Sequence, residues 1–216
     1  ARQAEVLIHV VDISGSTDIQ GQSVNVGTHD PREDIKFAEE EFDSWFKQIL
    51  EREWQKLSKE IEKTKIKLAD GITDRFSGLG VKVNHVHEVL QNLGLLTKKP
   101  NEWDDSDLTK FAQMLRKKTK PMLIAANKAD LCKSLEITNE IHKNREIINC
   151  SSETELLLKK AAKADLIEYI PGNEKFVINK NADISAPQKA ALNLAESVLS
   201  KLNSTGIQTA LNSAVF

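Results

Sequence analysis

The sequence has few cysteines, no long hydrophobic run and little excess charge, and each shortage excludes a class of protein. Cys132 and Cys150 are the only cysteines among 216 residues, and they do not stand at the spacing of a metal-binding motif. Buried thiols in a reducing compartment are therefore favoured over a disulfide. No apolar run approaches the roughly 18–20 residues that span a bilayer, so we expect no membrane contact and a cytoplasmic location. The net charge of −2 argues against a globally basic nucleic-acid binder, and we expect no DNA partner, although it leaves room for a local basic patch.

What the sequence does contain is a short apolar run at residues 121–126 that ends abruptly in a polar tetrad. The run is continuous rather than alternating, which is typical of a buried parallel strand. The tetrad Asn127-Lys128-Ala129-Asp130 follows directly. It is therefore predicted to lie at the carboxyl end of a strand, where open α/β sheets bind their ligands.

The side chains of the tetrad fit the hydrogen-bonding edge of a guanine base. The carboxylate of Asp130 can accept hydrogen bonds from N1–H and the 2-amino group together. Asn127 can donate to N7, and Lys128 can lay its methylene stem over the base while its ammonium stays in solvent. Adenine would leave Asp130 unpaired, which costs roughly 1.5–3 kcal/mol for each hydrogen bond to a charged group. A strand that ends in an Asx-type turn is the alternative explanation of the same residues.

A second predicted strand, at residues 145–150, ends in Ser151-Ser152-Glu153 and leads into a helical pattern of apolar residues. The first N–H groups of a helix have no partner within the helix, so the backbone of Ser151 and Ser152 could donate to the guanine O6. Ser152 also fits a helix N-cap of the Ser-x-x-Glu type with Glu155. The two roles are compatible, and the segment therefore supports a base site without proving it.

These two motifs resemble the fourth and fifth guanine-recognition motifs of the translation-factor-like P-loop GTPases. Residues 10–18 (VVDISGSTD) and 27–35 (GTHDPREDI) resemble signatures of archaeal-type members of the YchF branch of the Obg superfamily, and so do residues 160–164 and 169–172. The resemblance spans essentially the whole chain.

The resemblance implies a GTPase that binds GTP and GDP with Mg²⁺, hydrolyses GTP, and associates with the ribosome or with translation. It also implies which residues bind the nucleotide: Asn127, Lys128, Asp130, Ser151 and Ser152. The intact Asp130 favours GTP over ATP.

Other parts of the family pattern do not occur in the sequence. We find no G-x-x-x-x-G-K-[ST] motif for the phosphates, no switch threonine and no magnesium-binding Asp-x-x-Gly. Residues 12–15 match the last pattern only on paper, because they follow its usual place by one helix. The sequence therefore predicts a fragment, inactive by itself, with no nameable catalytic residue. The phosphate and Mg²⁺ ligands, and a C-terminal TGS domain, are expected outside it. The alternative is a non-catalytic nucleotide-binding or interaction module.

The pattern of predicted elements indicates an α/β fold class, a partial P-loop NTPase domain with a Rossmann-like, mostly parallel sheet. We predict a buried strand at residues 5–12 and a long loop at 13–30, and then a strong helix start at Asp30-Pro31-Arg32-Glu33. Apolar residues at three- and four-residue steps from Ile35 to Leu68 predict one helix of about 38 residues that ends before Gly71.

Residues 37–100 interrupt the α/β pattern and are predicted to form an inserted helical or coiled-coil lobe. Residues 1–36 and 101–216 would then form the C-terminal part of the GTPase domain. Shorter helices are expected at 84–92, 105–118 and 187–202, and a short edge strand at 176–178. The lobe has a basic face that could contact RNA or the ribosome through phosphates, or that could simply be solvated, since Glu60 and Glu62 dilute it. Its lysines are Lys56, Lys59, Lys63, Lys65 and Lys67.

Overall fold

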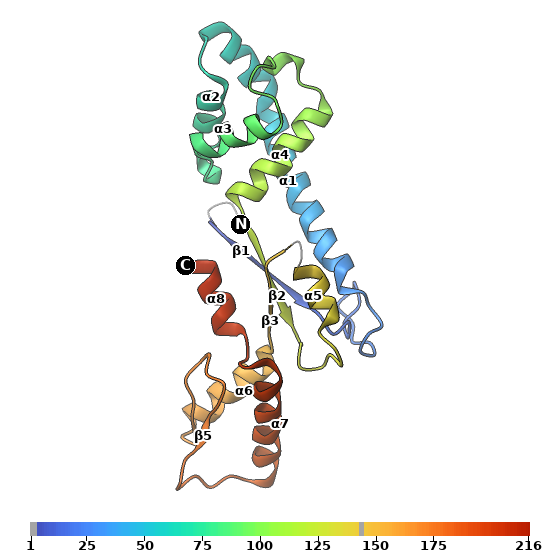
Figure 1. Ribbon diagram of the computed structural model, residues 1–216, viewed down its shortest axis with the longest axis vertical. Helices are drawn as coiled ribbons and strands as arrows, with labels where there is room; N and C mark the ends of the chain where they lie inside the picture. The colour runs from blue at the N-terminus through green and yellow to red at the C-terminus, as the bar shows by residue number, and fades with distance from the viewer. Residues whose placement is uncertain (1–3, 143–144) are drawn as a thin grey trace. The chain divides into compact units, whose positions relative to one another are not determined.

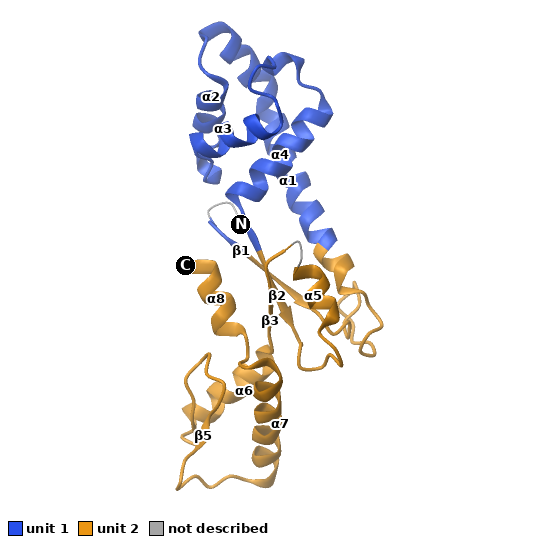
Figure 2. Cartoon of the chain, in the orientation of Figure 1, with its two compact units in different colours: residues 1–7, 36–122 blue, residues 8–35, 123–216 orange. Residues whose placement is uncertain are grey.

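The computed structural model describes residues 4–142 and 145–216, which form two compact units (Figure 2). We call residues 8–35 and 123–216 the sheet unit, and residues 4–7 and 36–122 the helical unit. Among the described residues, no helix is both long and apolar enough to cross a membrane.

A three-stranded sheet organises the first part of the fold, in the order β1 (Leu7–Asp12), β2 (Met122–Asn127), β3 (Ile147–Asn149) (Figure 1). β2 and β3 are parallel. β1 runs parallel to β2, because the N–H of Leu7 donates to the carbonyl of Pro121 and the N–H of Ile13 donates to that of Asn127, each at 2.9 Å. These two pairs have the same sequence offset. The predicted α/β fold with a parallel sheet is confirmed.

β2 is apolar on both faces because the sheet unit buries both of them. Ile124 packs in one cluster with Val11 and Ile35, whereas Leu123 packs in another with Ala210 of α8 (Ile207–Val215). This double burial is the physical reason for the continuous apolar run in the sequence.

The remaining elements of the sheet unit follow β2 in the chain. α6 (Ser152–Lys163) packs against α7 (Ala186–Leu202) through Leu158, Leu192 and Leu199. A two-stranded antiparallel sheet joins β4 (Ile167–Glu168) to β5 (Val177–Ile178), which lies within the predicted edge strand. The helix α5 (Glu136–His142), which is only seven residues long, was not predicted from the sequence.

The long predicted helix is shorter in the structure and is followed by a second helix. α1 (Pro31–Thr64) begins where predicted but has 34 residues, because Lys65 adopts a left-handed φ of 58° and ends it. α2 (Leu68–Phe76) runs through Gly71, so the predicted break at that glycine is wrong. A Cβ on Gly71 would lie 3.1 Å from Cγ1 of Ile61, so the glycine lets α2 pack closely on α1.

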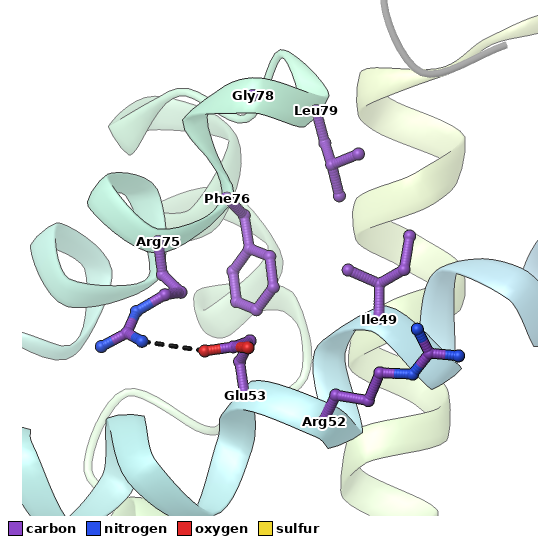
Figure 3. Close-up of a pocket in the computed structure, with 7 residues that line it drawn as sticks. All are labelled: Ile49, Arg52, Glu53, Arg75, Phe76, Gly78 and Leu79. Atoms are coloured by element: carbon purple, nitrogen blue, oxygen red, sulfur yellow. Dashed lines mark hydrogen bonds and ion pairs between the residues drawn. The ribbon is translucent and has the colours of Figure 1, made fainter.

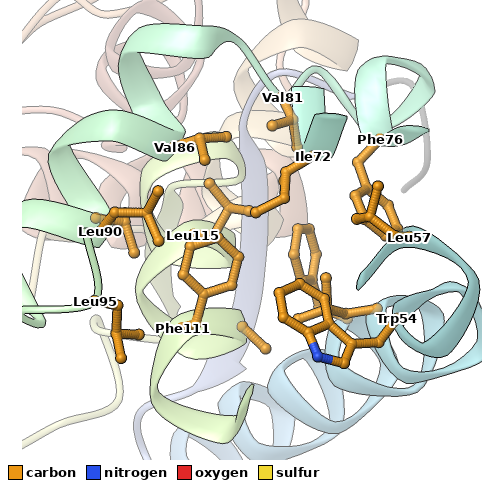
Figure 4. Close-up of a cluster of buried hydrophobic side chains, with 14 of the residues drawn as sticks. Trp54, Leu57, Ile72, Phe76, Val81, Val86, Leu90, Leu95, Phe111 and Leu115 are labelled. Atoms are coloured by element: carbon orange, nitrogen blue, oxygen red, sulfur yellow. The ribbon is translucent and has the colours of Figure 1, made fainter. Parts of the chain in front are cut away.

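The helical unit has its own hydrophobic core, shown in Figure 4. Trp103 packs in this core between two aromatic rings, with ring centroids 4.6 Å from Trp54 and 5.1 Å from Phe111. α1 and α2 pack there with α3 (Val83–Asn92), α4 (Asp105–Thr119) and two short 3₁₀ turns (Ser77–Leu79 and Pro100–Glu102).

The boundary of the helical unit differs from that of the predicted lobe. The unit extends to residue 122, whereas the lobe was predicted to end at residue 100. The cause is α4, because Phe111 and Leu115 are completely buried in the core that the other helices form. Helical spacing in the sequence located α4 but did not show which core it belongs to.

Candidate functional site

The polar tetrad lies at the carboxyl end of β2 and is fastened to the end of β3. The N–H of Ala129 donates to the carbonyl of Cys150 at 3.1 Å, and the N–H of Cys150 donates to that of Ala126 at 2.8 Å. The side-chain oxygen of Asn127 accepts a hydrogen bond from the N–H of Ser152 at 3.0 Å. Because that oxygen is occupied, the NH₂ group of Asn127 is the end left to donate to a ligand.

Lys128 joins the tetrad to the end of β1. Its backbone has a left-handed φ of 60°, and its ammonium donates to Asp12 at 2.7 Å, to Thr17 at 2.8 Å and to Ser16 at 3.0 Å. The expectation that this ammonium stays in solvent is therefore wrong. The side chain is 38% exposed, so its methylene stem still has a free surface on which a flat base could lie.

Asp12 is the centre of this cluster and is 13% exposed. One carboxylate oxygen accepts from the N–H and hydroxyl of Ser14, and the other from Ser16, Thr17 and Lys128. Burial would raise the pKa of Asp12, but the hydrogen bonds from Lys128 and the three hydroxyls outweigh it and lower the pKa far below its ordinary value. The sequence reasoning gave these loop residues no role. A strand-end aspartate followed by three hydroxyl residues is the signal that could have found them.

Ser151 and Ser152 are placed next to the tetrad, but their amides are occupied. α6 begins at Ser152 and its N-cap is Ser151, one residue earlier than predicted. The N–H of Ser151 donates to the carbonyl of Thr205 at 2.9 Å, and that of Ser152 to Asn127. A base O6 would have to share these donors, so the role of the two amides stays a prediction.

A glycine just before α8 allows the chain to approach β3 at this point. Gly206 has a φ of 74°, and a Cβ there would lie 1.9 Å from the carbonyl oxygen of Asn149. Only glycine combines this backbone conformation with so close an approach. The neighbouring carbonyl of Thr205 is thereby brought to Ser151.

Asp130 differs from its neighbours because its side chain is unpaired. The residue is half-buried, and within the described part of the chain its carboxylate makes no hydrogen bond or ion pair. It lines an open hollow of about 500 Å³ whose walls are mostly apolar. The other lining residues come from the tetrad loop, α6 and α7: Leu131, Glu153, Thr154, Leu157, Ala191, Leu194, Ala195, Ser197, Val198 and Lys201.

The arrangement presents a free carboxylate and a free amide donor three residues apart on a fastened loop. A planar ligand with two adjacent N–H donors and one acceptor would match them, and guanine is such a ligand. The structure thus brings Asn127, Lys128 and Asp130 together, as their sequence adjacency requires, and adds Asp12 from another strand.

The carboxylate of Asp12 is the buried charge of this cluster. We expect Asp12→Asn to lower the free energy of unfolding by roughly 1–3 kcal/mol at neutral pH, because an amide cannot match the ammonium and hydroxyl donors. In the wild type this contribution is present above the ordinary pKa of 3.8 and is lost as pH falls through the lower folded value. Urea unfolding at pH 7 measures the first effect, and a series from pH 7 down to pH 2 follows the beginning of the second.

Asp183→Asn is the matched control, because Asp183 is exposed and makes no contact among the described residues. Equal stability of the two variants would contradict the role given to Asp12.

The loop that follows β1 holds one further ionisable pair. Nε2 of His29 lies 2.9 Å from a carboxylate oxygen of Asp34, and the His29 side chain is only 10% exposed. The hydrogen bond to Asp34 raises the pKa of His29 above 6.5, although burial acts in the opposite direction. Protonated His29 therefore stabilises the folded loop.

We accordingly predict that this stabilisation is fully present below pH 6.5 and is lost as pH rises through the higher folded pKa. His29→Gln should remove this part of the pH dependence, as measured by thermal unfolding between pH 5 and 9. His87→Gln, at an exposed histidine of α3, should leave it intact. A wild-type profile that is flat across this range would contradict the assignment.

Comparisons with known proteins find relatives that are named as GTP-binding proteins. Residues 125–216 match the family described as "Obg-like GTPase YGR210-like, G4 motif-containing domain". The chain is 34% identical over 218 residues to a Methanocaldococcus jannaschii protein named uncharacterized GTP-binding protein MJ1332, and it covers 53% of that protein. It is 28% identical to uncharacterized GTP-binding protein C428.15 of Schizosaccharomyces pombe, with 80% of this chain aligned to 42% of that one.

A solved structure is similar over the whole chain. It is the crystal structure of a GTP binding protein from Pyrococcus horikoshii OT3, with 41% identity and a TM-score of 0.80, and the match covers 58% of that protein. The chain thus spans about half the length of the curated relatives it matches. Residues 125–216, which include the tetrad, α6 and α7, are thus similar to the G4 motif-containing domain of the Obg-like GTP-binding proteins.

Proposed function

We propose that this chain supplies the guanine-recognition part of an enzyme that hydrolyses GTP to GDP and phosphate. The observation that carries the proposal is the unpaired carboxylate of Asp130, held on a fastened loop beside an open hollow. The relatives named as GTP-binding proteins support it. A non-catalytic nucleotide-binding module is the alternative, in which the same site binds guanine without hydrolysis.

Each residue of the tetrad has a separate task in this proposal. Asp130 accepts from N1–H and the 2-amino group, the NH₂ group of Asn127 donates to N7, and the stem of Lys128 covers one face of the base. GTP and GDP present the same base, so these contacts hold both. Adenine has neither donor, since its N1 is an acceptor and it lacks the 2-amino group, and it would leave Asp130 desolvated and unpaired.

The residues present do not form a magnesium site. Within the described ranges, no group of three or more His, Cys, Asp or Glu could hold a metal ion. The carboxylate of Asp12 is already filled by its hydrogen bonds. Phosphoryl transfer depends on phosphate positioning and Mg²⁺, and the resemblance to P-loop GTPases implies that residues outside this chain would supply them.

The same resemblance supports three further parts of the proposal. The parent protein would belong with the YchF branch, carry a TGS domain, and act on or near the ribosome in the cytoplasm. Guanine recognition at Asp130 does not depend on any of these, and it can be tested separately.

We predict that Asp130→Asn weakens GDP binding roughly ten- to hundredfold, because it removes a charge-assisted pair worth about 1.5–3 kcal/mol. Xanthine nucleotides should gain relative to GDP, since an amide offers one donor and one acceptor to the altered base edge. Titration calorimetry with GDP, GTP, XDP and ATP measures this, on the 216-residue chain and on the full-length natural protein.

Asp183→Asn serves again as the matched control and should bind like the wild type. Equal affinity of the wild type for ATP and GTP, or an unchanged preference in Asp130→Asn, would overturn guanine recognition.

A second candidate function, RNA binding, is favoured by a basic stripe on α1. The stripe consists of Arg52, Lys56, Lys59 and Lys63, whose spacing of four, three and four residues places them on one helix face. All four are exposed, and among the described residues none makes an ion pair. The stripe is about 16 Å long at 1.5 Å per residue.

The acidic residues on one flank of the stripe are paired with an arginine. Arg75 of α2 pairs with Glu53 at 2.8 Å and with Glu60 at 2.7 Å. Figure 3 shows the first of these pairs, with Arg52 directed away from it. Glu62 is exposed on the opposite flank of the stripe. Two other lysines of the predicted basic face, Lys65 and Lys67, follow the stripe beyond the end of α1. The stripe therefore forms a row of positive charge that is suited to phosphates.

Replacing the four stripe residues by glutamine should therefore weaken binding of a single-stranded oligouridylate and make it less dependent on salt. The slope of log K against log salt should shrink by about 3, since each phosphate contact on a single strand contributes roughly 0.7. Fluorescence anisotropy at several KCl concentrations measures the slope.

A matched quadruple variant of exposed lysines in the sheet unit has the same change in net charge: Lys160, Lys163, Lys175 and Lys189 to glutamine. A similar change of slope in both variants would show that total charge, rather than the stripe, governs the binding.

A further inference from the structure

Lys201 is bound to the base-recognition loop although it belongs to no recognised motif. It stands in the last turn of α7, and its ammonium donates to the carbonyls of Ala129 at 3.2 Å, of Asp130 at 3.0 Å and of Cys132. A lysine ammonium has three donors and no acceptor. All three of its donors are therefore used in hydrogen bonds to the backbone of one loop.

The carbonyls that Lys201 holds are those that fix the direction of the Asp130 side chain. The carbonyl of Ala129 belongs to the peptide plane before Asp130, and the carbonyl of Asp130 belongs to the plane after it. Because peptide units are planar, fixing both oxygens restricts the φ and ψ of Asp130, and with them the direction of its Cβ. Lys201 thus acts on the carboxylate without touching it.

A second lysine fastens the loop from the other side. Lys128, two residues before Asp130, is bonded through its ammonium to Asp12, Ser16 and Thr17. The side chain of Asp130 itself makes no hydrogen bond or ion pair within the described ranges. Its orientation therefore depends on the backbone, and the backbone is held by Lys128 on the β1 side and by Lys201 on the α7 side.

We propose that Lys201 is a positioning residue for base recognition, which sets the angle of the Asp130 carboxylate and thereby the preference for bases that carry a 2-amino group. This inference rests on the proposed guanine site and adds a specificity determinant some 70 residues away in the sequence. It also gives α7 a mechanical connection to the nucleotide, because any displacement of the last turn of α7 moves the carbonyls beside Asp130.

The experiment compares GDP with IDP, whose hypoxanthine base lacks the 2-amino group. Titration calorimetry on the full-length protein gives the GDP/IDP affinity ratio for the wild type, Lys201→Met and Lys201→Arg. We expect Lys201→Met to lower that ratio about tenfold, the value of one hydrogen bond to a charged group. Affinity for IDP should fall less, and Lys201→Arg should restore most of the ratio, since it keeps the cation and its donors.

The ratio separates positioning from a merely structural role. Lys201 is solvent-exposed, so we expect its loss to change the thermal unfolding midpoint little. General damage to the loop would weaken GDP and IDP equally. Lys189→Met is the matched control and should keep the wild-type ratio, because Lys189 lies on the same helix and its side chain makes no hydrogen bond or ion pair among the described residues.

Two results would overturn the inference: an unchanged ratio in Lys201→Met, or an equal loss of both nucleotides. If the wild type itself shows no preference for GDP over IDP, the proposed guanine site is refuted, and the inference about Lys201 is refuted with it. If the wild type has the preference and Lys201→Met retains it, the guanine site stands and only the role of Lys201 is refuted.

Discussion

The ion pair between Asp12 and Lys128 is the interaction on which the candidate site depends. It joins the carboxyl ends of two neighbouring parallel strands. Three hydroxyl side chains share the pair, so the charges are satisfied where solvent is scarce. This pair also explains why Lys128 tolerates a left-handed backbone, since the ammonium is held on the β1 side while the chain turns back toward Asp130.

The double burial of β2 gives that pair a rigid base. Apolar clusters on both faces fix the strand, and Asn127 at its end is bonded to the first turn of α6. Side chains that leave the end of such a strand inherit its position. Around Asp130 the backbone and the neighbouring side chains are hydrogen-bonded, whereas the Asp130 carboxylate has no hydrogen bond or ion pair among the described residues.

The helical unit is stabilised by a hydrophobic core of its own. Its core of aromatic and aliphatic side chains is separate from the clusters that hold the sheet. Charges are laid out in stripes along α1, one neutralised by Arg75 and one left basic. In the proposed binding of RNA, such a surface would act through charge rather than shape, and the binding would be sensitive to salt.

The sequence by itself determined the features that depend on neighbouring residues: the apolar strand, the start of α1 at Pro31, and the tetrad with Asp130. Period, capping and motif spacing are local, so they can be read without a fold. Only the tertiary structure decided the end of α1 at Lys65, the membership of α4 in the helical core, and the bonds of Lys128 and Lys201. Those bonds join residues some 70 to 116 positions apart, and no local pattern encodes which distant groups a long flexible side chain will meet when the chain is packed.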